Sequence, residues 1–454
     1  MQDRTYLKQK YRKISVALIS NLLILGAMAA VMRPSFETND DIVFAELGSG
    51  LRGVKDAHLV FQNYGLGMIY RLLYGVTGRL PWYTIVQYMI LFAAFTVVTY
   101  VLISRLGEIS GLCLFVIFAC GFGYEGYIHL QFTKTAGIAA AAAVFLLLHL
   151  LEQEKYSWWG IAGGILLAVI AYMYREDQFW ASCGLMAGAG VLFLFDLRKY
   201  RNKKLRRIGI CVLTFGVLLL SVFGVDRWDS SKYRSAEWKE YQEFNQLRSE
   251  LLDYGFPDYD RNQEIYEELG ISREAYELYK SWNFNDTEKF DTEVMKKLVD
   301  LKQKRPLTIR TVTAFIRRFP SDLLRMPMFY SFAVFALLWI LCGKKDVFSV
   351  ISVLAECLLL VAVYFYLYYQ GRYMVNRVDV GLWFSACLVM LWIFSSGEVR
   401  YMNTKVSVLL CMICVALGQF MMYKDWRLAT SSIPEARVSQ RAVLETIGTD
   451  KEHT

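Results

Sequence analysis

The polar segments of this 454-residue chain contain no cysteine, which excludes a framework of disulfide bonds outside the apolar parts of the sequence. All nine cysteines lie within apolar runs and are expected to behave as small buried hydrophobic residues: Cys113, Cys120, Cys183, Cys211, Cys342, Cys357, Cys387, Cys411 and Cys414. The last two form a C-x-x-C pair. No second pair or ligand cluster accompanies them, so we interpret them as core residues rather than as a redox or zinc site.

The chain also lacks the polar composition of a soluble protein. Hydrophobic residues make up 55% of it and its mean hydropathy is +0.30. Apolar runs of about 18–20 residues recur, the length that crosses about 30 Å of hydrocarbon. These runs exclude a soluble enzyme, a disordered scaffold and a nucleic-acid-binding protein. The net charge of +8 therefore mainly indicates basic cytoplasmic loops rather than an anionic partner.

We predict an all-α fold, a polytopic membrane helix bundle of about 11 spans. The first span, 14–32, follows a basic N-terminus that the positive-inside rule places in the cytoplasm. This run is longer than the apolar core of a signal peptide, about 7–15 residues, and is interpreted as an uncleaved helix. The further predicted spans are 82–104, 109–124, 135–151, 157–174, 178–196, 208–225, 327–342, 347–369, 380–396 and 404–423.

One apolar segment, 58–78, complicates the count of spans. Its four glycines and its interior Arg71 are typical of a helix at the outer interface or of a re-entrant hairpin. Alternatively, 109–124 is the element that does not cross the membrane. Either choice leaves 11 spans.

The composition changes sharply between 226 and 326, a stretch rich in charged residues and tyrosine. Basic loops at 196–207, 342–346 and 398–405 are expected in the cytoplasm, so parity places 226–326 and the C-terminus outside. Helical periodicity predicts a small helical extracytoplasmic insert with helices over 235–253, 260–269 and 272–282, the last capped by Ser272. The predicted organisation is a membrane module (1–225) with a first outer loop (33–81), the insert (226–326), C-terminal membrane helices (327–423) and a tail (424–454). We expect the chain to lie in the cytoplasmic membrane of the cell.

Four polar clusters fall on the predicted outer side. They are Glu37–Asp41, Arg175–Asp177, Gly371–Arg377 with Asp379, and the group His129, Gln131 and Lys134. Ionisable side chains are costly near hydrocarbon, so their clustering predicts a polar cavity at the outer surface. Sugar transfer from a polyprenyl-phosphate donor needs a carboxylate that deprotonates the acceptor hydroxyl. It also needs fixed cations that hold the leaving phosphate, and the lipid tail requires a site at membrane level.

The first outer loop carries a further indication. Asn39-Asp40-Asp41, directly after an uncleaved first helix, resembles the acidic motif of the GT-C class of integral-membrane glycosyltransferases. The stretch His58-x-x-Phe-x-Asn63, Gly67, Leu73-Tyr74 and Pro81-Trp82-Tyr83 is similar to the juxtamembrane helices that follow that motif. The resemblance in overall architecture extends over most of the chain. The resemblance in sequence motifs is confined to residues 39–83. The chain departs from the best-known members because its soluble insert lies mid-chain, where they have a large C-terminal globular domain.

This resemblance implies that Asp40 or Asp41 is the general base and that the other orients it or binds a divalent cation, Mg²⁺ or Mn²⁺. The predicted phosphate-binding residues are Arg372, Arg377, Lys134, Arg175 and His58. The implied partners are a lipid-linked sugar donor, a glycan, lipid or protein acceptor, and membrane lipids.

Simpler interpretations of the same residues remain open. Asp40 would cap a helix over 41–51, and Arg372 with Arg377 would reach lipid headgroups. Arg175 would be neutralised within its own loop, Lys134 would anchor at the headgroups, and His58 and His129 would be satisfied interfacial histidines.

Two other function classes also fit a membrane chain. A transporter or flippase of lipid-linked saccharides would use the same arginines, but it predicts internal repeats and ionisable or broken-helix sites near the midplane. The sequence shows no convincing repeat, and its charged clusters lie at the ends of spans. A non-catalytic membrane assembly protein would bind a partner through 226–326, and this leaves Asn39–Asp41 without a role.

Overall fold

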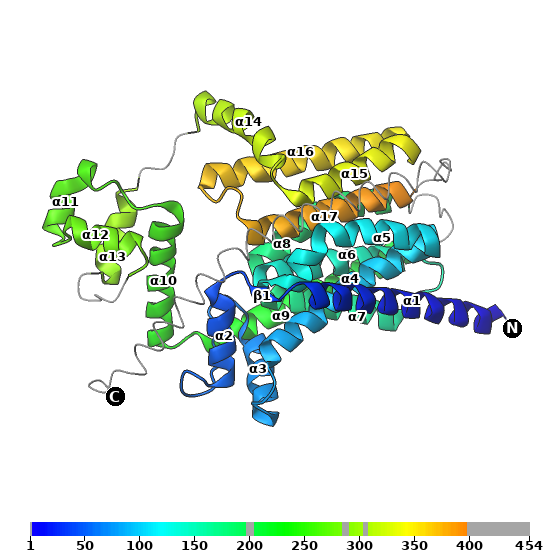
Figure 1. The fold of residues 1–454 in the computed structure, drawn as a ribbon, viewed down its shortest axis with the longest axis horizontal. Coiled ribbons are helices and arrows are strands. Elements are labelled where there is room, and N and C mark those ends of the chain that lie inside the picture. Colours follow the sequence, from blue (N-terminus) through cyan, green and yellow to red (C-terminus); the bar gives the residue numbers. More distant parts are fainter. Residues whose placement is uncertain (1, 197–203, 284–289, 303–306, 397–454) are drawn as a thin grey trace.

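The computed structural model describes residues 2–196, 204–283, 290–302 and 307–396 (Figure 1). The described part confirms the all-α class. Its α-helices are α1 (Gln2–Val31), α2 (Asn39–Ser49), α3 (Tyr64–Val76), α4 (Trp82–Leu106), α5 (Glu108–Gly123), α6 (Phe132–Glu152), α7 (Trp158–Tyr174), α8 (Glu176–Asp196), α9 (Lys204–Lys232), α10 (Ala236–Tyr254), α11 (Gln263–Glu268), α12 (Arg273–Lys280), α13 (Thr292–Asp300), α14 (Ile309–Leu323), α15 (Pro327–Cys342), α16 (Val347–Gln370) and α17 (Asn376–Ser395). Shorter elements are the π-helix η1 (Tyr124–Ile128), the 3₁₀-helix η3 (Asp260–Asn262) and the strands β1 (Ser35–Phe36) and β2 (His129–Leu130).

Seven helices of the described part are long and apolar enough to cross a membrane: Lys8–Val31, Trp82–Leu106, Glu108–Ile128, Phe132–Glu152, Leu205–Lys232, Val347–Gln370 and Asn376–Ser395. An eighth results if α14 and α15, which meet at 85°, are one broken span. The predicted count of 11 is not confirmed. α7 has only 17 residues, α8 falls outside the set, and the predicted span 404–423 and tail lie outside the described residues.

The structure also bears on the two segments between which the sequence could not decide. The helix Glu108–Ile128 is long enough to span, whereas α3 has 13 residues and is not among the candidates. The segment 58–78, which contains the four glycines and Arg71, forms only this 13-residue helix. At 1.5 Å per residue, a helix of this length is too short to cross about 30 Å. Of the two segments, 108–128 is therefore the one that is long and apolar enough to cross.

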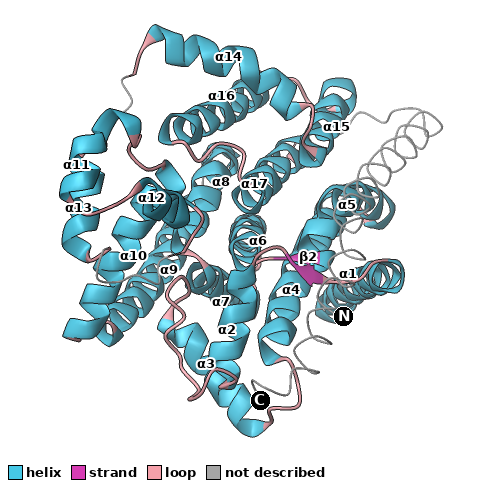
Figure 2. Ribbon diagram, turned by 60° about the vertical axis from the view of Figure 1, so that its left-hand side comes forward, coloured by secondary structure: helices cyan, strands magenta, loops and turns pink. Residues whose placement is uncertain are grey.

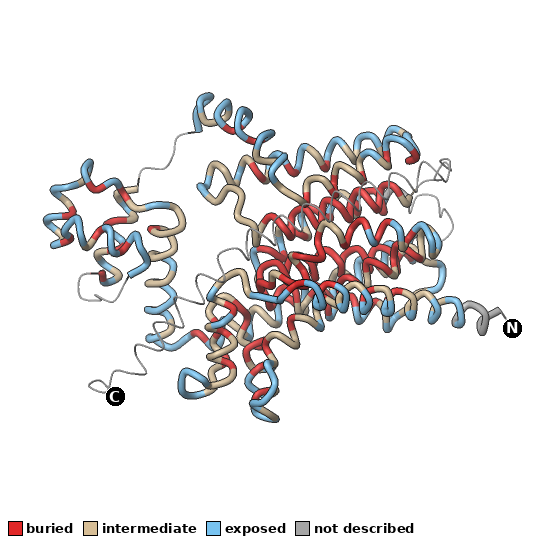
Figure 3. The backbone as a smooth tube through the Cα atoms, viewed as in Figure 1, coloured by how far each residue is buried: buried red, intermediate tan, exposed pale blue. Residues whose placement is uncertain are grey.

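α6 forms the centre of the bundle, with α4, α7, α8 and α17 packed around it (Figure 2). Nearly all of its residues are buried, and burial is concentrated there and in α17 (Figure 3). Its small side chains, such as the run Ala139–Ala143, let neighbouring helices approach closely. An alanine-rich helix is thus shielded by the ring of helices around it.

Three helices of this core start at the same end of the bundle. Near their first turns, α6, α8 and α17 meet at Gly137, Gln178 and Gly381. A Cβ on Gly137 would lie 2.7 Å from the Cα of Gly381 and 3.0 Å from Gln178 Nε2. We call the end where these helices begin the α2 end, because α2 and α3 also lie there (Figure 1). Helix N-termini carry partial positive charge, so this end favours anions.

Gly137→Val is expected to destabilise the bundle, because the added side chain would collide with the backbone of α17. The cost of overpacking is about 1–3 kcal/mol, and it should appear as a lower midpoint of thermal unfolding in detergent. The matched control is Gly163→Val on α7, where an added Cβ has no atom within 4 Å. Equal losses from the two variants would show that the close crossing is not what stabilises the bundle.

The insert has its own core and projects from the α2 end (Figure 1). The predicted cap Ser272 is confirmed, because its Oγ accepts a hydrogen bond from Ala275 N. Ser235, the first residue of another predicted helix, also proves to be a cap, and its Oγ accepts a hydrogen bond from Trp238 N. The predicted boundary at 226 instead falls inside α9, which continues to Lys232. A helix long enough to span the membrane therefore runs directly into the polar segment.

Candidate functional site

The first loop after α1 is tied to the segment before α6 by a short parallel ladder. β1 pairs with β2 so that Ser35 faces His129 and Phe36 faces Leu130. The backbone N–H of Glu37 extends the ladder by donating to the Leu130 carbonyl at 2.9 Å. This register places the Glu37 side chain beside the start of α6.

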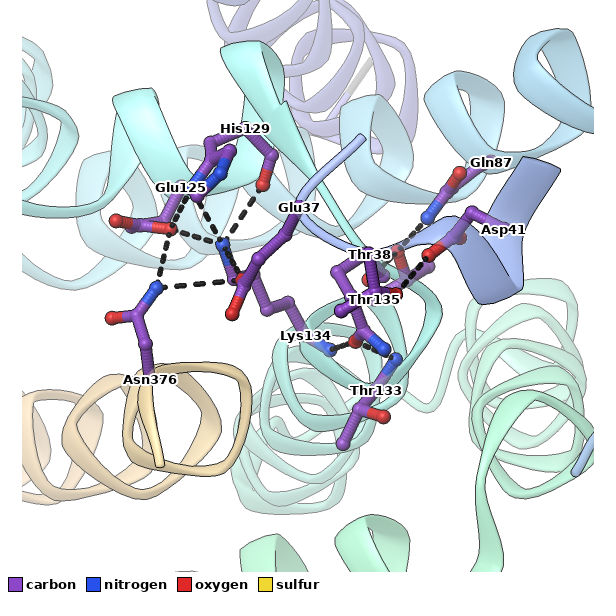
Figure 4. A network of polar contacts seen from close by, with 11 residues as sticks. Glu37, Thr38, Asp41, Gln87, Glu125, His129, Thr133, Lys134, Thr135 and Asn376 are labelled. Carbon is purple, nitrogen blue, oxygen red and sulfur yellow. Dashed lines mark hydrogen bonds and ion pairs between the residues drawn. The ribbon is translucent and has the colours of Figure 1, made fainter. Parts of the chain in front are cut away.

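Lys134 is the centre of a buried ionic network (Figure 4). Its side chain is 1% exposed and pairs with two carboxylates, Glu37 (Nζ to Oε2 2.5 Å) and Glu125. The amide of Asn376, at the start of α17, donates to the same carboxylate oxygens at 3.4 and 3.2 Å. An ammonium held in this way is no headgroup anchor. It is also no longer available to a phosphate, so we do not carry Lys134 forward as a phosphate ligand.

Sequence reasoning missed Glu125 entirely. This residue stands in η1, a widened helical turn of the kind that often marks functional sites. His129 Nδ1 approaches the same carboxylate at 3.4 Å, so His129 also belongs to the network. A lone glutamate nine residues before a lysine gives no signal in the sequence, because an irregular turn between them brings the two together.

The network has ligand spacing for a metal ion but already contains a cation. Ligand atoms of Glu37, Glu125 and His129 lie within 4.8 Å of one another. Lys134 Nζ contacts both carboxylates and approaches His129 Nδ1 at 3.3 Å. The ammonium thus occupies the position that a metal would take, and we assign no metal to this cluster.

Asp41 joins α2 to the same end of α6. Its carboxylate accepts hydrogen bonds from Tyr83 Oη (2.8 Å), Thr38 Oγ1 (3.4 Å) and the backbone N–H of Phe132, the first residue of α6. The side chain is fully buried. Burial raises the pKa of Asp41 to about 7, and the neighbouring charge of Asp40 also raises it. The hydrogen bonds from these donors act in the opposite direction. Asp41 therefore ties α2 to Tyr83 and to the start of α6 through both of its carboxylate oxygens.

Asp40 is in a different situation. The interpretation of Asp40 as the cap of a helix over 41–51 is wrong, because α2 begins at Asn39 and Thr38 holds the N-cap position. Two residues of helix were missed because Asn39 and Asp40 continue the turn. Asp40 lies in the first turn, is half-buried, and makes no hydrogen bond or ion pair with any described residue. Of the two aspartates it is the one whose carboxylate has no hydrogen-bond partner among the described residues.

Three arginines gather at the starts of α8 and α17. Arg175 precedes α8, Arg372 lies in the loop before α17, and Arg377 is in its first turn. Burial lowers the pKa of Arg175, and the charges of Arg372 and Arg377 act in the same direction, whereas Asp177 opposes them. Arg372 and Arg377 are therefore both close enough to Arg175 to repel it, an arrangement that a bound anion would relieve.

Two of these arginines have internal partners. Arg175 contacts Asp177 at 3.2 Å, as the self-neutralising interpretation expected, and Arg372 contacts Asp253 of the insert at 2.6 Å. Arg377 is half-buried and forms no ion pair within the described part of the chain. Of the three arginines, Arg377 is therefore the one whose guanidinium has no carboxylate partner among the described residues.

His58 belongs to an aromatic contact with the insert rather than to the arginine group. Its ring stacks on Trp238 with centroids 4.5 Å apart and lies 5.0 Å from the ring of Tyr233. Its Nδ1 lies 2.7 Å from Asp56 Oδ1. The structure thus supports the interpretation of His58 as a satisfied histidine, and we do not carry it forward as a phosphate ligand.

The α2 end of the bundle therefore brings together the acidic first loop, the starts of three core helices and a group of arginines. Asn376 links the parts, because it contacts Glu37 of the first loop and precedes Arg377 directly. Comparison of the chain with protein families, with curated proteins and with solved structures found no match.

Proposed function

We propose that the chain is a GT-C-like integral-membrane glycosyltransferase that transfers a sugar from a polyprenyl-phosphate donor to an acceptor. One observation carries the proposal: the acidic first loop and the three arginines lie at one end of the bundle, connected by the contact between Asn376 and Glu37. An acid that is free to take a proton and cations that favour an anion are the two groups that this transfer needs.

In the proposed reaction Asp40 takes the proton of an acceptor hydroxyl, and the hydroxyl oxygen attacks the anomeric carbon of the sugar. The bond from that carbon to the phosphate oxygen breaks, and polyprenyl phosphate leaves with the bonding electrons. Arg377 and Arg175 hold the phosphate as its charge develops. Asp41 does not touch the reactants; it fixes α2, and with it Asp40, on the first turn of α6.

The two aspartates do not offer a paired site for Mg²⁺ or Mn²⁺. Both carboxylate oxygens of Asp41 accept hydrogen bonds from the protein, which leaves Asp40 as a single ligand. Hard divalent cations take several oxygen ligands, so we route no step through a metal. We propose further that the N-terminus is cytoplasmic and that the α2 end with the insert faces the outer side of the cytoplasmic membrane.

The test is release of polyprenyl phosphate, a product that does not depend on the acceptor. The chain in lipid nanodiscs is given a panel of polyprenyl-phosphate sugars and a cell-envelope fraction, and the released lipid is measured by mass spectrometry. Arg377→Gln is expected to lower the rate by about 10- to 100-fold, since a charge-assisted hydrogen bond is worth about 1.5–3 kcal/mol. The matched control is Arg79→Gln, at an exposed arginine between α3 and α4. Equal rates for the two variants, or no release from any donor, would contradict the proposal.

One observation favours a second candidate, proton-coupled movement of a lipid-linked saccharide across the membrane. Glu356 is buried within α16, where transporters place ionisable groups. Transport moves the saccharide intact, so it predicts translocation of a labelled lipid-linked sugar without release of polyprenyl phosphate. A non-catalytic assembly role, the third class, gains no such support.

A further inference from the structure

Glu356 lies on the one buried stripe of α16. The buried residues of this helix are Glu356, Leu360 and Tyr364, spaced by four so that they share one face. At 1.5 Å per residue, Glu356 is about 14 Å from the first residue of α16 and about 21 Å from the last. This depth places the carboxyl inside a hydrocarbon layer about 30 Å thick, out of reach of either surface.

The carboxyl fits a space that the neighbouring helices leave for it. Gly188 of α8 lacks a side chain here: a Cβ on it would lie 3.0 Å from Glu356 Oε2 and 3.6 Å from Val389 of α17. The Glu356 side chain is 2% exposed, and neither oxygen has a hydrogen-bond partner among the described residues. The group is therefore enclosed by three helices without being paired.

No charged side chain of the described residues acts on Glu356. The titratable groups near it are two thiols, Cys357 on its own helix and Cys387 on α17. α8 presents Gly188. α14 packs at the far end of the stripe, where Phe319 contacts Tyr364. Tyr364 in turn donates to Asp379, so that carboxylate is satisfied elsewhere.

We propose that Glu356 is a proton-binding site inside the bundle and that its proton holds α16 against α8 and α17. An ionised carboxylate without a donor is strongly unfavourable in a medium of low polarity, whereas the neutral acid is tolerated. A single carboxyl offers too few ligands for a metal ion, so the proton is the ligand that fits. Loss of the proton leaves a charge that water must reach, and the contact between α16 and its two neighbours then opens. This inference does not rest on the proposed glycosyltransferase activity.

The first test is modification by the hydrophobic reagent dicyclohexylcarbodiimide, which reacts with protonated carboxyls. The carboxyl proton moves to one nitrogen of the reagent, the carboxyl oxygen bonds to its central carbon, and the O-acylurea rearranges to a stable N-acylurea. At about pH 7.5 in nanodiscs we expect peptide mass spectrometry to show the adduct on Glu356. The exposed Glu264 of the insert is expected to stay unmodified, because it lies at the water-accessible surface and outside the apolar bundle that a hydrophobic reagent enters. Absence of an adduct on Glu356 at this pH overturns the proposal.

The second test compares thermal unfolding of the wild-type chain, Glu356→Gln and the control Glu264→Gln between about pH 6 and about pH 9. The folded chain binds a proton that the unfolded chain has released, so the free energy of unfolding must fall as pH rises. As pH rises over this range, the unfolding midpoints of the wild-type chain and of Glu264→Gln are expected to fall further than that of Glu356→Gln. The amide of Glu356→Gln is neutral throughout. Parallel curves for all three chains overturn the proposal. If Glu356→Gln does not fold, the adduct experiment on the wild-type chain decides.

Discussion

Replacement of Lys134 by methionine is expected to lower the free energy of unfolding by about 3–5 kcal/mol, the usual cost of removing one partner from a buried ion pair. The reason is the environment of the network. Lys134 is 1% exposed, and its loss leaves Glu37 and Glu125 as neighbouring carboxylates with only Asn376 and His129 to compensate them. The measurement is equilibrium unfolding in mixed micelles, followed by circular dichroism.

A control separates burial from the mere loss of an ion pair. Arg12 contacts Glu108 at 2.7 Å, but its side chain is 70% exposed, so Arg12→Met should cost only about 0–1 kcal/mol. Addition of Glu37→Gln and Glu125→Gln to Lys134→Met should restore part of the lost stability, because no buried charge is then left unpaired. A single variant no worse than Arg12→Met would show that the network does not stabilise the fold.

Asp40→Asn is expected to slow the release of polyprenyl phosphate by at least about 100-fold, the lower end of what general base catalysis contributes. Asparagine keeps the shape of the side chain and cannot accept the proton. Because Asp40 makes no hydrogen bond or ion pair with a described residue, the unfolding midpoint should change little. Loss of activity with stability retained is the signature expected of a base, and the assay is the one given above for Arg377.

Two further variants on α2 sharpen the result for Asp40. Glu46→Gln removes another carboxylate of α2, which pairs with the exposed Arg52. This variant should leave the rate of lipid release unchanged. Asp41→Asn disturbs the contacts with Tyr83 and the start of α6, so it should lower both stability and rate. If Asp40→Asn and Glu46→Gln release the lipid at the same rate, Asp40 is not the base.

Local features of the fold were accessible from the sequence. Apolar runs long enough to span predicted α6, α16 and α17 to within a few residues, and the serines at 235 and 272 marked helix starts correctly. The number of spans was not accessible in the same way. The apolar run that begins at Pro327 has the composition of a span, but its composition alone does not reveal the 85° bend at which it meets α14.

The candidate site was predictable only in its parts. Residue type and position pointed to Asp40, Asp41 and the arginines, since charges at the ends of spans are conspicuous. The partner of each residue was not predictable, because Glu37, Glu125 and Asn376 meet through tertiary contacts between segments far apart in the chain. The π-helix that aims Glu125 at Lys134 has no counterpart in the hydrophobic pattern.

The central position of α6 has a consequence for how the protein tolerates different bilayers. Lipid touches the outer helices, such as α1, α9 and α16, whose spans are mostly unburied, whereas α6 is enclosed along nearly its whole length. Changes in hydrocarbon thickness act on helices in contact with lipid by tilting them. The carboxylates and the ammonium at the first turn of α6 are therefore insulated from membrane composition, and their geometry should be the same in thick and thin membranes.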